Sequence, residues 1–154
     1  MTTQDTRTLL LLLERAQADR DAALTACQRA EQAAARQRTQ AEQLQTYRGE
    51  YQQRWSVQFG REGRPEIVQC YRSFMTRLEE AVQQQAHLLG HADGQLAVMR
   101  ETLQVQERRV AAVRKLIERR LAEQQALSSR RDQRETDESA QRASQHAKAR
   151  LETN

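Results

Sequence analysis

The sequence predicts an all-α protein: a long two-helix antiparallel coiled-coil hairpin with an overhanging C-terminal helix or tail. Three observations lead to this prediction. The composition is typical of solvated helices, apolar residues recur every seventh position along two arms, and the only proline closely follows two glycines between those arms.

The composition excludes a globular domain with a thick core. Of the 154 residues, 38% are hydrophobic and 4% are aromatic, and the mean hydropathy is −0.94. The net charge is +4, but the 25 basic and 21 acidic residues are interspersed, which is typical of solvated helix faces. This profile favours long helices that each bury one narrow stripe.

The first helix is expected over about residues 6–58. One column at seven-residue spacing defines its seam: Leu9, Ala16, Ala23, Ala30, Gln37, Leu44 and Tyr51. A companion column supplies the second seam position, with two polar exceptions: Leu12, Asp19, Ala26, Ala33, Gln40 and Tyr47. The alanines in the middle predict a thin seam with closely spaced helices.

The second helix is expected over about residues 65–125. Its first column has eight consecutive apolar members: Val68, Met75, Val82, Leu89, Leu96, Leu103, Val110 and Ile117. The second column is interrupted by two glutamines: Tyr71, Leu78, Gln85, Ala92, Met99, Gln106 and Val113. So many successive heptads indicate a coiled coil.

A short turn over about residues 59–64 is expected to reverse the chain. Gly60 and Gly63 are predicted to adopt left-handed conformations, and Pro65 with Glu66 suits a helix start. A reversal here pairs positions whose numbers sum to about 125, which places Tyr51 near Phe74. The polar segment 126–154 then has no opposing arm, and we expect a frayed extension of one single coiled-coil hairpin.

All six aromatic rings of the chain fall within residues 47–74. The apolar face near the turn is wider than a two-helix seam requires, because Ile67, Phe74 and Ala81 run alongside the seam of the second arm. Some rings are expected to close the turn, and others to remain exposed as a docking patch.

The tip pattern resembles that of the flagellar FliJ family. The resemblance rests on Leu44, Tyr47 and Tyr51, a short glycine-containing turn, and the stretch YRSFMTRLEEAV from Tyr71 to Val82. It implies a non-enzymatic stalk of the flagellar type III export apparatus. Such a stalk inserts in the hexameric export ATPase FliI, docks on the membrane export gate protein FlhA, and acts with export chaperones.

The resemblance also implies sites and a location. The positions matching the family's gate-docking pattern are Gln40, Leu44, Tyr47, Tyr51, Phe74, Leu78, Ala81 and Gln85. ATPase-facing positions are expected at the paired ends of the arms: Leu9, Leu13, Arg20, Arg109, Lys115 and Arg119. The implied location is cytoplasmic, at the inner face of the cell membrane beneath the flagellum.

Other functions receive less support from the residues. His87 and His91 are spaced like metal ligands, but further ligands are lacking, so no metal and no other cofactor are expected. The chain has no nucleophile–base pair or phosphate loop and is not expected to be an enzyme. The run Leu9–Leu13 is too short for a signal peptide or a membrane span. Membrane contact is therefore expected only through partners.

Three alternative hypotheses stay open at this point. One is the equivalent stalk of a virulence type III secretion system. Another is a basic coiled coil that binds nucleic acid, although no aromatic lies among the basic residues 108–120. The third is a dimeric coiled coil without a hairpin, which Pro65 disfavours.

Overall fold

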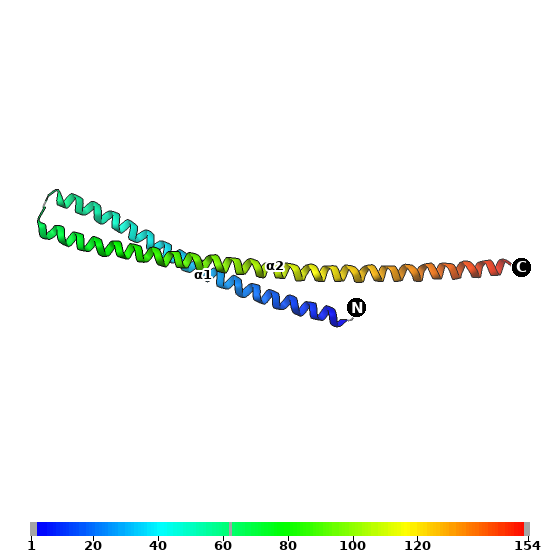
Figure 1. Cartoon of the computed structure of the whole chain (residues 1–154). Helices are drawn as coiled ribbons and strands as arrows, with labels where there is room; N and C mark the ends of the chain where they lie inside the picture. The colour runs from blue at the N-terminus through cyan, green and yellow to red at the C-terminus, as the bar shows by residue number, and fades with distance from the viewer. Residues whose placement is uncertain (1–2, 62, 153–154) are drawn as a thin grey trace. The chain divides into compact units, whose positions relative to one another are not determined.

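The computed structural model describes residues 3–61 and 63–152, which form two α-helices (Figure 1). Helix α1 spans Thr3–Phe59 and helix α2 spans Pro65–Glu152. The two helices pack against each other as a hairpin, so the predicted all-α antiparallel architecture is confirmed. Among the described residues, neither helix contains a stretch long and apolar enough to cross a membrane.

Internal contacts divide the chain into two compact units. Unit 1 comprises Met1–Ala18 and Arg108–Asn154, and unit 2 comprises Asp19–Glu107. Unit 2 contains the turn, where the end of α1 runs beside the start of α2 (Figure 1). Each helix contributes to both units.

The turn begins and ends as the sequence predicts, but its glycines do not behave as expected. Helix α2 starts at Pro65, whose missing N–H is not needed in a first helical turn. No glycine among the described residues has a positive φ, so the predicted left-handed conformations of Gly60 and Gly63 are wrong. The Arg61 amide donates to the Gln58 carbonyl over 3.0 Å, and this bond ends α1 with ordinary backbone angles. Glu62, within the predicted turn, lies outside the described residues.

The seam of α2 follows the prediction throughout. Every member of both predicted columns, from Val68 to Ile117, is buried or half-buried. The polar exception Gln85 is buried too, and its side-chain amide donates to the carbonyl and the side-chain oxygen of Gln37, over 3.1 and 2.6 Å. This buried polar layer is thus hydrogen-bonded across the two helices.

The seam of α1 differs from the prediction in one column. The column from Leu9 to Tyr51 is buried or half-buried, as predicted. The predicted companion column is wrong, because Leu12, Gln40 and Tyr47 are exposed. The true second column lies one residue further along: Leu13, Arg20, Cys27, Ala34, Ala41, Arg48 and Trp55. The sequence pattern did not reveal this column because it contains Arg20 and Arg48, and charged residues are not expected in a seam. An arginine can nevertheless bury its aliphatic stem while its charged head reaches outward.

The seam core of unit 2 consists mainly of small side chains. Cys27, Ala34 and Leu96 are buried together, and they are flanked by four half-buried apolar residues, Ala30, Ala92, Met99 and Leu103. Small residues permit close helix approach but bury little area, as the alanine-rich pattern predicts. The predicted register is confirmed at Tyr51 and Phe74, whose ring centroids are 4.9 Å apart.

The C-terminal extension is a regular helix rather than a frayed one. Helix α2 continues to Glu152, and every side chain described from residue 125 onward is exposed. The segment contains neither glycine nor proline and is rich in strong helix formers. Arg142 and Glu138 add a helical i, i+4 ion pair at 3.4 Å. The prediction treated the loss of a partner helix as the loss of helical structure. Residues 153–154 lie outside the described residues.

Replacing Gly90 and Gly94 with alanine should stabilise the hairpin. Both glycines are helical and exposed, and a Cβ atom added at either position meets nothing within 4 Å. Each substitution should therefore raise the free energy of unfolding by about 1 kcal/mol, the difference in helix propensity. Urea unfolding followed by circular dichroism measures this. Gly60→Ala, in the turn, is the control and should gain much less. Destabilisation by the paired substitution would show that the glycines serve a bend.

Candidate docking site

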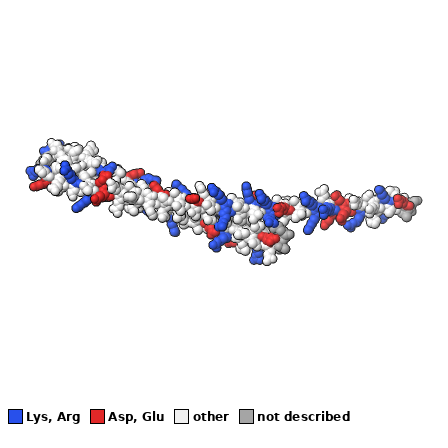
Figure 2. Space-filling view, in the orientation of Figure 1, with Lys and Arg blue, Asp and Glu red and all other residues white. Residues whose placement is uncertain are grey.

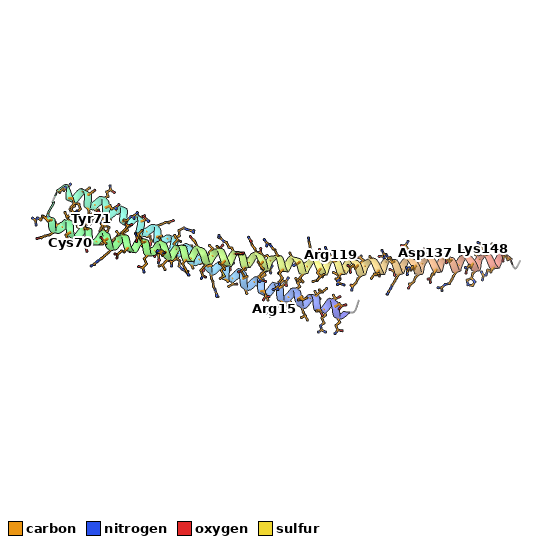
Figure 3. All side chains as sticks on the ribbon, viewed as in Figure 1. Arg15, Cys70, Tyr71, Arg119, Asp137 and Lys148 are labelled. Carbon is orange, nitrogen blue, oxygen red and sulfur yellow. The ribbon has the colours of Figure 1, made fainter. Side chains whose placement is uncertain are left out.

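Three rings close the hairpin at the turn. The centroids of Trp55 and Tyr71 are 5.3 Å apart, those of Phe59 and Tyr71 are 5.1 Å apart, and those of Trp55 and Phe59 are 5.6 Å apart. Tyr71 projects from the beginning of α2 (Figure 3), and the other two rings come from the end of α1. All three are half-buried and contact one another. Aromatic pairs at these distances stabilise the turn beyond simple burial.

A second row of rings leads from the seam to solvent. Phe74 contacts Tyr51 across the two helices, and Tyr51 contacts Tyr47 on α1 at a centroid distance of 4.5 Å. The Arg54 guanidinium carbon lies 5.7 Å from the centroid of the Tyr51 ring. Tyr47 ends the row and is 42% exposed, whereas Tyr51 and Phe74 are half-buried. Tyr47 is thus the ring of this row most available to a partner.

The Tyr47 phenol is neutral near physiological pH, as an ordinary tyrosine is, and its surroundings raise its pKa further. Its pKa is raised above the ordinary tyrosine value, chiefly by a hydrogen-bonding interaction with the Tyr51 side chain and next by desolvation. A neutral phenol presents an apolar ring face and a hydroxyl that donates and accepts hydrogen bonds. This combination suits an aromatic anchor in an interface.

Tyr47 borders a shallow groove of about 470 Å³ between the helices. The groove is lined by Gln40, Gln43, Leu44, Tyr47 and Gln85. Four of these residues belong to the predicted gate-docking set. Gln43 was not predicted, because it lies outside both seam columns and no motif marks it. The groove is therefore lined by one exposed ring, one leucine and three glutamine side chains.

The remaining members of the predicted docking set are less accessible. Leu78 is buried in the seam, with 7% exposure, and Phe74 and Ala81 are half-buried. Gln85 lines the groove, yet its side-chain amide already donates to Gln37. These residues lie under the surface of the predicted docking set, and Gln40 and Tyr47 are its exposed members.

The predicted ATPase-facing residues divide between exposed and seam positions. Within unit 1, Arg109, Lys115 and Arg119 are exposed, whereas Leu9 and Leu13 are half-buried in the seam. The exposed apolar residues of this segment are instead Leu10, Leu11 and Leu12, at 51–61%. The prediction did not select them, because a run of five leucines hides which ones face the other helix. Arg20, in unit 2, is half-buried and pairs with Asp21 at 2.9 Å.

The histidine pair does not form part of a metal-binding cluster. His87 and His91 are both exposed. No group of three or more His, Cys, Asp or Glu side chains suited to a metal ion occurs among the described residues. On the face shown in Figure 2, basic and acidic side chains are interspersed, and much of the surface near the turn is uncharged.

The family model described as "Flagellar FliJ protein" matches residues 6–149. No curated protein matches the chain, and no solved structure matches it either.

Truncating Trp55 should destabilise the hairpin more than truncating Tyr47. Trp55→Ala should lower the free energy of unfolding by about 2 kcal/mol, because it removes two ring contacts and part of the seam. Tyr47→Ala should cost less than about 1 kcal/mol, because the side chain is 42% exposed and its one ring contact is to Tyr51 on the same helix. Urea unfolding of both variants measures the difference. Equal losses would contradict this division of roles among the rings.

Proposed function

Because the chain belongs to the flagellar FliJ family, a component of the flagellar export apparatus, we propose that it is the stalk coupling the export ATPase to the export gate. FliJ-family proteins are non-enzymatic export components. In this proposal, unit 1 inserts in the hexameric ATPase FliI, and the tip of unit 2 docks on the gate protein FlhA. The stalk thereby promotes the export of flagellar proteins and, through them, motility and chemotaxis.

The single observation behind the gate contact is the exposed Tyr47 ring beside its groove. The ring is held at one end of a row of contacts that continues through Tyr51 to Phe74 on the other helix. A held ring loses little conformational entropy when a partner binds, which favours affinity. Gln40 and Gln43 supply amide groups around the groove for hydrogen bonds to the partner.

The ATPase contact is supported by two features of unit 1. The segment 108–120 contains six basic residues and only one acidic residue, Glu118, and it suits an acidic lumen. The exposed leucines at positions 10, 11 and 12 offer apolar surface for the same partner. Leu9 and Leu13 hold α1 in the seam and thereby orient these three leucines outward.

The proposed location follows from these partners. The protein would work in the cytoplasm, held at the inner face of the cell membrane by the gate protein. Export chaperones are proposed as further partners. Neither nucleic acid nor a cofactor has a part in this function.

Tyr47→Ala should weaken binding to the cytoplasmic part of the gate protein by about 30-fold, as expected for an aromatic hot spot of about 2 kcal/mol. Calorimetric titration of the full chain measures this, and circular dichroism verifies retained helicity. Val57→Ala is the matched control, since Val57 lies near the turn on α1, is 57% exposed and is outside the docking set. Wild-type affinity in the tyrosine variant would refute docking through this ring.

Reversing charge in the basic segment should impair assembly with the ATPase. The variant Lys115→Glu with Arg119→Glu should lose co-elution with the ATPase hexamer at moderate salt, because it would repel an acidic lumen. The control is Lys148→Glu with Arg150→Glu, which makes the same charge change in the exposed end of α2. If both pairs of substitutions reduced co-elution equally, the loss would result from the change in net charge and not from this segment.

A further inference from the structure

The hairpin of unit 2 has two edges, and ion pairs mark one of them. Three ion pairs link α1 and α2 along this charged edge. Arg48 pairs with Glu79 at 3.0 Å, Arg38 with Asp93 at 3.2 Å, and Glu31 with Arg100 at 3.3 Å. Glu31 and Arg38 are seven residues apart on α1, and Glu79, Asp93 and Arg100 share one heptad column of α2. Such pairs are usual at the positions that flank a coiled-coil seam.

The flanking columns on the other edge carry no charge over the same length. We call these columns the uncharged edge: Ala26, Ala33, Gln40 and Tyr47 on α1, with Phe74, Ala81, Leu88, Gln95 and Thr102 on α2. Phe74 and Ala81 are half-buried beside the seam, as are Ala26 and Ala33. Leu88 is 49% exposed and Tyr47 is 42% exposed. The uncharged edge therefore begins at the docking patch and continues along both helices.

This pattern exceeds what a two-helix coil requires. A two-stranded seam uses two apolar positions in each heptad, whereas helices that pack in larger bundles use three adjoining ones. On α2 the third position is occupied by Phe74, Ala81 and Leu88 in succession. On α1 two of its four members are alanines, Ala26 and Ala33, whose small side chains let another backbone approach closely. The edge thus has the character of a bundle face that lacks its third helix.

We propose that the uncharged edge binds an amphipathic helix of the same gate partner that docks at Tyr47, forming a three-helix arrangement. This inference rests on the proposed function. One partner is favoured because Phe74 and Ala81 belong to the docking set, and Leu88 is the next member of their column. A second copy of the chain on this edge would cover Tyr47 and compete with the gate. Nucleic acid does not fit, because the columns lack cations.

The chemistry of the incoming helix follows from the edge. It presents an uncharged, largely apolar face toward the alanines, with large side chains that fill the space beside them. Its other face is polar. The partner therefore contacts two regions of the hairpin: the groove at Tyr47 and the shaft as far as Leu88 and Gln95.

Two exposed leucines on opposite edges allow a matched test. Leu88 lies on the uncharged edge, and Leu24, 40% exposed, lies on the charged edge seven residues before Glu31. Full-length variants Leu88→Glu and Leu24→Glu are titrated with the cytoplasmic part of the gate protein. Leu88→Glu should weaken binding at least 10-fold, because a carboxylate would be buried under the incoming helix. Leu24→Glu should stay within about twofold of the wild type.

Leu88→Glu removes an apolar side chain as well as adding a charge, so a second variant is needed that adds the charge alone. Gln95 is exposed in the same column as Leu88, and Gln95→Glu adds only a charge. It should weaken binding about fivefold. Wild-type affinity in both the Leu88 and the Gln95 variants would overturn the proposal. If Tyr47→Ala still abolished binding in that case, docking at the tip would stand.

Two other outcomes are equally informative. If the wild-type chain does not bind the gate at all, both the proposed function and this inference fail. If analytical ultracentrifugation shows a wild-type dimer that Leu88→Glu converts to a monomer, the uncharged edge is a self-interface, and the proposed gate helix is wrong.

Discussion

With two helices and no third layer, each helix buries side chains against one neighbour only, and most features of this protein follow from that constraint. A seam of two columns suffices, and the side chains beyond it contact water. The core can therefore be built from residues as small as Ala34 and Cys27, and the rest of the surface is free for charge. The candidate docking site accordingly lies on the surface, beside a groove between the helices.

The rings near the turn serve two purposes: some close the hairpin, and another is exposed for the proposed partner. Trp55, Phe59 and Tyr71 contact one another and close the turn, where few other side chains are available to pack. Tyr51 and Phe74 bridge the helices one step further on and support Tyr47 from one side. Stability and the proposed recognition thus draw on two neighbouring groups of rings. A partner can engage Tyr47 without opening the turn.

Register in this hairpin is set by polar as well as apolar contacts. The buried Gln85 amide donates to the half-buried Gln37, and a shifted pairing would leave these hydrogen bonds unmade. Ion pairs on the charged edge act in the same direction, although each is exposed enough to contribute little energy alone. These charges lie on the charged edge, whereas the columns of the uncharged edge contain no charged residue. The asymmetry gives the hairpin a distinct face that a symmetric coil would lack.

The sequence by itself determined the two-helix hairpin, the helix start at Pro65, the seam of α2 and the pairing of Tyr51 with Phe74. These features follow from periodicity and from a proline, and both are local properties that can be read along the chain. The rings proposed for docking could be named from the sequence, because they cluster within residues 47–74. Which of these rings are exposed could not be predicted, since exposure depends on which residues the other helix covers.

Only the tertiary structure decided the second seam column of α1. The columns containing Leu12 and Leu13 are adjacent, and the apolar members Ala26, Ala33 and Tyr47 favoured the wrong one. Arg20 and Arg48 fill the true column because their stems pack while their charged heads reach Asp21 and Glu79 at its border. That choice turns Tyr47 outward and separates the charged edge from the uncharged one. Periodicity measures spacing along one helix, but the partner helix decides which of two adjacent columns it covers.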